Sequence, residues 1–124
     1  MTSRDLTENV EQLQIRRALE LIRDRQVAII ARLAASAAAT ADLVVTGRSH
    51  NVPAQATTFG KRLANVGQEC VLALGRTEDL LARYPLRGLK GPVGTPQDLL
   101  DLFEGDEERV DGLEVFVASR LGMA

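Results

Sequence analysis

The sequence predicts an all-α protein, a portion of a bundle of long helices. Residues 7–44 contain neither Pro nor Gly, which is typical of one long helix. Apolar residues recur there at intervals of three, four or seven, so they share one helix face. No stretch alternates between polar and apolar residues as a half-buried strand does, and no repeat is present in the sequence. The fold class therefore follows from helical periodicity without competing strand patterns.

The first helix is predicted over residues 7–45, with Gly47 just past its end. The residues that share its apolar face are Ile15, Leu19, Ile22, Ile29, Leu33, Ala37, Ala41 and Val44, with the polar Gln26 among them. At about 1.5 Å per residue the helix is roughly 55 Å long. Side chains are small between Ala34 and Ala41, so a neighbouring helix can approach closely there.

Gly and Pro residues divide the rest of the chain. The predicted elements are a loop over 46–56, a second long helix over 57–84, a glycine-rich loop over 87–94 and two short helices within 95–122. Thr57 or Thr58 can cap the second long helix, and Pro85 stops it. Residues 1–124 are thus predicted to form a single helical segment.

The two short helices carry their own end signals. Thr95 is the predicted N-cap of the first, with Pro96 at its first helical position. Asp106 is the predicted N-cap of the second, and Gly122 lies just past its end.

Two helices of this length cannot cover their own apolar residues. Each would bury one stripe against the other and leave much of the rest exposed. Further helices beside the pair, from the same chain or another, are therefore expected.

Composition excludes several classes of protein. A net charge of −2 and only 3% aromatic residues argue against nucleic-acid binding. No apolar run approaches the roughly 18 residues of a membrane span, so no membrane segment is predicted. The single cysteine, Cys70, can form no internal disulfide, which indicates a reducing compartment and a cytoplasmic protein. Cys70 lies on the apolar stripe of the second long helix, so a buried structural thiol is expected in preference to a catalytic one.

The single histidine, His50, is the strongest candidate for chemistry. It lies in the predicted loop between the long helices, beside Ser49 and Asn51. An imidazole titrates near neutral pH and can act as a general acid or base. A structural or surface histidine is the alternative reading, and by itself the commoner one. Basic residues near the loops could attract an anionic small molecule, and they are Arg48, Lys61, Arg62, Arg87 and Lys90.

Other kinds of site have no support in the sequence. A metal site is not predicted, because there is no second histidine and no CxxC pattern. Residues 88–94 are not a P-loop, since no Gly-Lys-Ser/Thr follows them. No Gly-x-Ser-x-Gly elbow is present, so a hydrolase triad is not predicted. No cofactor is expected.

Five separated motifs resemble those of a known enzyme family. Residues 2–9 have Thr-Ser, four variable positions, an acidic residue and Asn, which is similar to the first signature of the fumarase/aspartase superfamily. Residues 47–58, with a histidine followed by Pro-Ala-Gln and Thr-Thr, resemble its second signature. Within the superfamily, residues 57–62, 87–95 and 102–106 resemble the adenylosuccinate lyase family. The resemblance covers almost the whole chain.

This resemblance implies a fold, a reaction and partners. The family forms a homotetramer around a bundle of long helices, with each site shared by three subunits. It eliminates fumarate from adenylosuccinate and from the succinyl-carboxamide intermediate of purine synthesis, both of them anionic substrates. His50 matches the general acid that protonates the departing nitrogen. Thr2 and Ser3 match hydroxyls that hold the substrate, and Ser49 matches a hydroxyl position near the fumarate carboxylate.

The chain departs from the family pattern at several points. Ser49 stands where a threonine is usual, which keeps the hydroxyl, and Val52 stands where a glutamine is usual. The family's third signature, a serine-rich loop that carries the general base, does not occur in these 124 residues. The family's upstream histidine and a downstream glutamine are also absent. The chain is therefore expected to be a truncated portion of a longer enzyme and to be inactive alone.

Two other functions remain open from the sequence. One is a non-catalytic helical module that only self-associates. The other is a sister enzyme such as argininosuccinate lyase or fumarase, against which residues 60–62 and 89–91 weigh.

Overall fold

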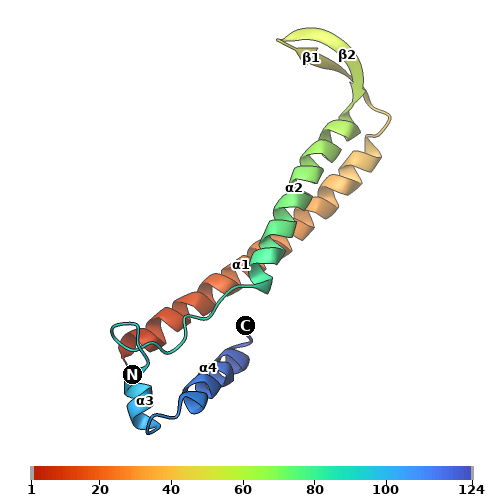
Figure 1. Cartoon of the computed structure of the whole chain (residues 1–124). Helices are drawn as coiled ribbons and strands as arrows, with labels where there is room; N and C mark the ends of the chain where they lie inside the picture. Colours follow the sequence, from red (N-terminus) through yellow and green to blue (C-terminus); the bar gives the residue numbers. More distant parts are fainter. Residues whose placement is uncertain (1, 124) are drawn as a thin grey trace. The chain divides into compact units, whose positions relative to one another are not determined.

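The computed structural model describes residues 2–123, and the chain is mostly helical, as the sequence predicted. The elements are α1 (Ser3–Ala39), β1 (Val44–Ser49), β2 (Val52–Thr58), α2 (Phe59–Ala82), α3 (Gln97–Leu102) and α4 (Glu107–Leu121) (Figure 1). They divide into two compact units. One unit combines the chain up to Glu20 with the chain from Leu80 onward, and the other spans Leu21–Asp79.

The unit from Leu21 to Asp79 is an antiparallel pair of helices, the later part of α1 and most of α2, joined by a hairpin (Figure 1). Small residues bring the two helices together near the hairpin. A Cβ atom at Gly60 would overlap the backbone of Ala37 and Ala41, so only glycine allows this approach. The prediction of a close helix contact at residues 34–41 is confirmed.

A β-hairpin stands where a loop over 46–56 was predicted, so the absence of strands in that prediction is wrong. β1 and β2 pair antiparallel, with Val44 opposite Thr58 and an irregularity between Thr46 and Arg48. Most of both strands is exposed, so no buried face imposed an alternating pattern on the sequence. β1 begins with three β-branched residues, Val44, Val45 and Thr46, a residue type that is common in strands.

The ends of the long helices differ from the predicted ones by a few residues. α1 begins at Ser3 rather than at residue 7, and it ends at Ala39 because the chain then turns into β1. α2 begins at Phe59, where the Thr58 hydroxyl accepts a hydrogen bond from the Lys61 amide at 3.1 Å. The predicted cap at Thr58 is thus confirmed, and α2 ends two residues earlier than predicted.

The other unit places α3 and α4 with the start of α1 and the loop between α2 and α3. Asp106 caps α4 by accepting from the Arg109 amide, and Gly122 ends it with a left-handed backbone, both as predicted. The predicted cap at Thr95 is wrong, because α3 begins one residue later with Pro96 in the cap position and no side-chain bond. Few apolar residues of this unit are buried. Among the described residues they are Leu99, Val110 and Met123.

Candidate functional site

A buried carboxylate, Asp5 on the first turn of α1, lies at the centre of the unit that contains α3 and α4. Only 3% of its surface is exposed. One oxygen, Oδ2, accepts a hydrogen bond from the Thr2 amide at 2.8 Å. The other, Oδ1, accepts from the amides of Lys90 at 3.1 Å and Gly91 at 3.0 Å and from the Arg87 guanidinium at 3.1 Å. A single side chain therefore holds four donors from two distant parts of the chain.

Asn9 lies one turn further along α1, on the same side as Asp5, and it is also buried. Its amide nitrogen donates to the Gly88 carbonyl at 2.9 Å, and its amide oxygen accepts from the Gly88 amide at 3.2 Å. The side chain thus pairs with both backbone groups of one residue in the glycine-rich loop. Gly88 has a φ of +83°, a left-handed conformation that glycine adopts without strain.

Asp5 and Asn9 anchor the glycine-rich loop to α1, and ion pairs surround these two buried residues. Arg87 contacts both Asp5 and Glu8, and the Lys90 ammonium lies 2.8 Å from Glu114 on α4. Glu114 also accepts from the Leu89 amide at 3.1 Å. The suggestion that Arg87 and Lys90 are available to attract an anion is therefore not supported by this geometry, since both pair with acidic residues inside the unit.

Hydrogen bonding sets the charge state of Asp5. The Thr2 amide is the largest influence that lowers the pKa of this carboxyl. Burial opposes it, and the Arg87 guanidinium and the amides of Gly91 and Lys90 lower the pKa further. The net result is a pKa below the usual range for aspartate, so Asp5 is ionised at neutral pH.

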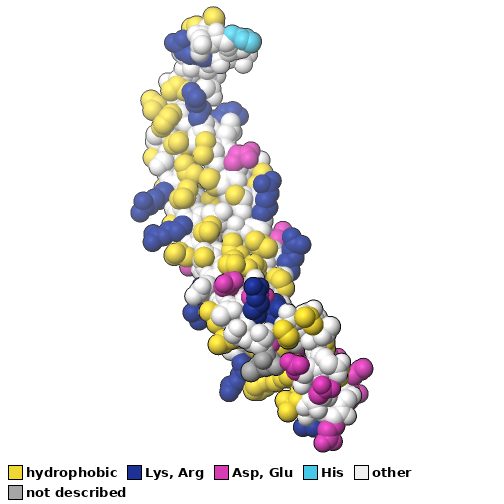
Figure 2. Space-filling view, turned by 90° about the vertical axis from the view of Figure 1, so that its left-hand side faces the viewer, with side chains coloured by type: hydrophobic (Ala, Val, Ile, Leu, Met, Phe, Trp, Pro, Cys, Tyr) yellow, Lys and Arg dark blue, Asp and Glu magenta, His cyan; other side chains and the backbone are white. Residues whose placement is uncertain are grey.

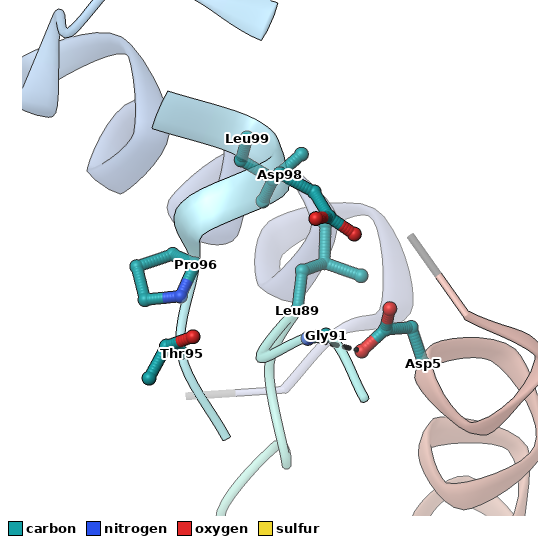
Figure 3. Close-up of a pocket in the computed structure, with 7 residues that line it drawn as sticks. All are labelled: Asp5, Leu89, Gly91, Thr95, Pro96, Asp98 and Leu99. Atoms are coloured by element: carbon teal, nitrogen blue, oxygen red, sulfur yellow. Dashed lines mark hydrogen bonds between the residues drawn. The ribbon is translucent and has the colours of Figure 1, made fainter. Parts of the chain in front are cut away.

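Two hollows border Asp5. The smaller, of about 10 Å³, lies between Asp5, Gly91 and the start of α3, and this volume is close to the minimum for one water molecule (Figure 3). The larger is an apolar groove of about 340 Å³. It is lined mainly by α1, the glycine-rich loop and α4, through Leu6, Val10, Leu13, Leu89, Val117 and Leu121.

Thr2 and Ser3, the predicted substrate-binding hydroxyls, lie beside Asp5 at the start of α1. Thr2 is half-buried and Ser3 is exposed. The Thr2–Asp5 contact is the arrangement in which an acidic residue on the first turn reaches back to the backbone amide before the helix. Sequence reasoning missed Asp5 as a site residue, although the spacing Thr-x-x-Asp is a known signal for such a cap.

Ser49 and His50, the other two predicted site residues, lie together at the tip of the β1–β2 hairpin and are exposed. Ser49 pairs with Val52, so His50 and Asn51 form a two-residue turn with φ values of 50° and 63°. Two positive φ angles are the mark of a type I′ hairpin turn. The Arg48 guanidinium donates a hydrogen bond to the Asn51 carbonyl at 2.9 Å, which stabilises the turn.

The four predicted site residues thus form two pairs, one in each unit of the chain. Thr2 and Ser3 adjoin the Asp5 anchor, whereas Ser49 and His50 share the hairpin tip. Along the chain, residues 4–48 lie between the two pairs, and most of them belong to α1. Within residues 2–123, no group of three His, Cys, Asp or Glu side chains is arranged to hold a metal ion.

Comparison with known proteins shows which enzymes the chain resembles. The chain is 39% identical over 121 residues to the adenylosuccinate lyase of Saccharomyces cerevisiae, which covers 98% of this chain. It is 32% identical over 123 residues to the adenylosuccinate lyase of Caenorhabditis briggsae. Over 98–99% of its length, the chain is similar to adenylosuccinate lyases. It spans about a quarter of the length of these relatives, 25% and 26% respectively.

The family likeness extends to a lyase with a different name. The N-acetyl-S-(2-succino)cysteine lyase of Dickeya dadantii is 36% identical over 98 residues, which is 77% of this chain and 21% of that protein.

No family model matches the chain. Among the described helices, none combines the length and the apolar character needed to cross a membrane.

Proposed function

We propose that this chain supplies part of the active site of an adenylosuccinate lyase, the enzyme that eliminates fumarate from adenylosuccinate-type substrates. The observation that carries the proposal is the similarity to adenylosuccinate lyases over 98–99% of the chain. We further propose a cytoplasmic homotetramer in which different subunits contribute the two pairs of site residues.

The proposed chemistry is a β-elimination. A base removes a proton from the carbon next to the one that bears nitrogen, the C–N bond breaks, and the electron pair leaves with the nitrogen. The imidazolium of His50 donates a proton to that nitrogen, so the leaving group departs as a neutral amine. Hydroxyls of Thr2, Ser3 and Ser49 donate hydrogen bonds to substrate oxygens. The base is not among the candidate residues of this chain.

The exposed position of His50 at a hairpin tip supports this role. A general acid must reach the substrate, and a side chain at the tip is accessible to a ligand or to another subunit. A buried histidine packed among apolar residues would instead have favoured the structural interpretation.

A hybrid enzyme tests the proposal. In this hybrid lyase, the matched quarter of the yeast adenylosuccinate lyase is replaced by the residues of this chain. Release of fumarate from adenylosuccinate, followed by its ultraviolet absorbance, is the expected result, and the chain alone is expected to release none. A hybrid lyase that folds and assembles like the yeast enzyme but releases no fumarate would favour a non-catalytic helical module.

A lyase acting on a succinylated cysteine is the second candidate, and the match to the Dickeya dadantii enzyme favours it. The replacement of the usual glutamine by Val52 is a further reason to test it. The same hybrid lyase can be offered N-acetyl-S-(2-succino)cysteine beside adenylosuccinate. An increased preference for the cysteine substrate, relative to the yeast enzyme, would support this candidate.

A further inference from the structure

One buried carboxylate joins two segments that lie far apart in the sequence. Asp5 Oδ2 accepts from the Thr2 amide, whereas Asp5 Oδ1 accepts from the amides of Lys90 and Gly91 and from the Arg87 guanidinium. Its two oxygens therefore face different partners. Thr2 lies next to Ser3, and both are substrate-binding residues in the proposed function.

The glycine-rich loop is shaped to reach this carboxylate. Gly91 has a φ of +63°, and a Cβ atom there would lie 2.9 Å from the Thr95 carbonyl oxygen. A larger residue would therefore have to move the loop, and with it the Lys90 and Gly91 amides that donate to Asp5. Figure 3 shows the bond from Gly91. Asn9 holds the same loop at Gly88, so the loop is fixed to α1 at two successive turns.

Burial leaves almost none of the Asp5 side chain open to a substrate. Its side chain is only 2% exposed, and its two oxygens accept hydrogen bonds from Thr2, Arg87, Lys90 and Gly91. Any influence on a reaction must therefore pass through the groups that it holds.

We infer that Asp5 is a positioning residue, which fixes the backbone at Thr2 and Ser3 against the Arg87–Gly91 loop so that both hydroxyls meet the substrate in one geometry. This inference rests on the proposed function, because it assigns substrate binding to Thr2 and Ser3. It makes both hydroxyls depend on a loop whose residues lie 82 to 86 positions from Asp5 in the sequence.

Replacement of Asp5 by asparagine distinguishes the bond to Thr2 from the three bonds to the loop. An asparagine side chain has one oxygen acceptor and one NH₂ donor. With its oxygen toward the loop it still accepts from the three donors there, now as a neutral acceptor, and it presents NH₂ to the Thr2 amide, so only the bond to Thr2 is lost outright. The opposite orientation would lose three bonds, so the first is expected. Asp5→Ala removes all four bonds. Glu11→Gln is the control, because it removes an exposed acidic charge from the same helix.

Hydrogen exchange in the 124-residue chain, measured by mass spectrometry, tests the loop contact. Asp5→Ala should speed exchange in the peptide that contains Lys90 and Gly91 by roughly 10- to 100-fold, the worth of a hydrogen bond to a charged acceptor. Asp5→Asn keeps these contacts as bonds to a neutral oxygen, so it should speed exchange less than Asp5→Ala does, and Glu11→Gln should leave it unchanged. Unchanged exchange in Asp5→Ala would overturn the inference.

Kinetics in the hybrid lyase test the effect on substrate binding. Asp5→Asn should raise KM for adenylosuccinate about tenfold or more while kcat changes much less, since the lost contact orients groups that bind the ground state. A purely structural role would lower the amount of folded enzyme and its thermal midpoint but leave KM unchanged. An unchanged KM in an active hybrid lyase overturns the role of Asp5 alone, whereas an assembled hybrid that is inactive with Asp5 intact overturns the proposed function.

Discussion

His50 occupies a backbone conformation that few residues accept, with a φ of 50° at the tip of the hairpin. Asparagine adopts left-handed backbone more readily than most side chains, whereas alanine does so less readily. Replacement of His50 can therefore remove the imidazole with or without disturbing the turn. This choice separates a chemical role from a structural one at a single position.

The first prediction concerns this pair of substitutions in the hybrid lyase. If His50 is the general acid, His50→Asn and His50→Ala should both lower kcat by roughly 10²–10⁴. KM should change much less, because the proton is transferred in the transition state. Thermal unfolding should be nearly unchanged for His50→Asn. A near-normal kcat in His50→Asn would remove His50 from the mechanism.

Asn51, the second residue of the turn, carries the next prediction. Its φ of 63° is easy for glycine and costs another residue about 1–2 kcal/mol. Asn51→Gly should therefore leave the hairpin as stable or stabilise it, and Asn51→Ala should lower the thermal midpoint of the chain. Ala54→Gly, in the extended strand β2, is the control and should be destabilising. Equal effects of glycine at 51 and 54 would argue against the type I′ turn.

At the scale of the elements, the loop between α2 and α3 is held to α1 mainly by polar contacts, and this makes the unit sensitive to acid. Asp5 faces Arg87 and backbone amides, Glu8 shares Arg87, and Lys90 and Glu114 pair on the other side of the loop. The lowered pKa of Asp5 means that its carboxylate stabilises the folded state at any pH above the unfolded pKa of about 3.9. That contribution is lost as the pH falls through the lower, folded-state pKa.

The third prediction follows from the lowered pKa of Asp5. The difference in unfolding midpoint between the unsubstituted chain and Asp5→Asn should be constant from neutral pH down to about pH 4 and should shrink below it. Subtraction of the two curves isolates the contribution of the Asp5 carboxyl. A difference that instead grows as the pH falls below 4 would contradict the lowered pKa of Asp5.

Sequence reasoning predicted the helices because their signals are local. Thr58, Asp106 and Gly122 mark helix ends with their own side chain or backbone, so they could be identified from a few neighbouring residues. The hairpin was missed because its exposed strands impose no apolar alternation and its turn contains no glycine. The bonds that join Asp5 and Asn9 to the glycine-rich loop were missed for another reason. Asn9 bonds to Gly88, 79 positions away, and no local pattern reveals that contact.

At the scale of the whole molecule, the chain leaves many large apolar side chains in solvent. Leu21, Ile22 and Val27 on α1 are 58%, 49% and 49% exposed. At about 100° per residue they point in three different directions around the helix. α2 adds Val66, Val71 and Leu72, each more than half exposed, and Figure 2 shows hydrophobic side chains along the surface of the helix pair. No single neighbour could cover all of these directions, so more than one further helix is needed.

Half-burial of Leu33 and Cys70 alters how this association should be probed. Leu33 lines the groove between α1 and α2, where it faces Gly67. A charge at Leu33 would therefore disrupt the helix pair itself as well as any contact with another chain. Cys70 is likewise only half-buried in this chain, so its predicted burial would require a neighbour. Fully surface-facing positions are the better choice for a test.

The last prediction is that the purified chain associates and that charges on the exposed apolar face weaken this association. Ile22 and Ile29 are each about half exposed and lie seven residues apart, hence on the same side of α1. Burial of a side chain of this size in an interface contributes about 1.5–3 kcal/mol, so Ile22→Asp and Ile29→Asp should each weaken association at least about tenfold. Gln68→Asp, at an exposed polar position on α2, supplies the same charge as a control. Sedimentation should show oligomers for the unsubstituted chain and for Gln68→Asp, with a shift toward monomer for the two isoleucine variants. A compact monomer at every concentration would show that these side chains are stable in water and that no bundle partner is required.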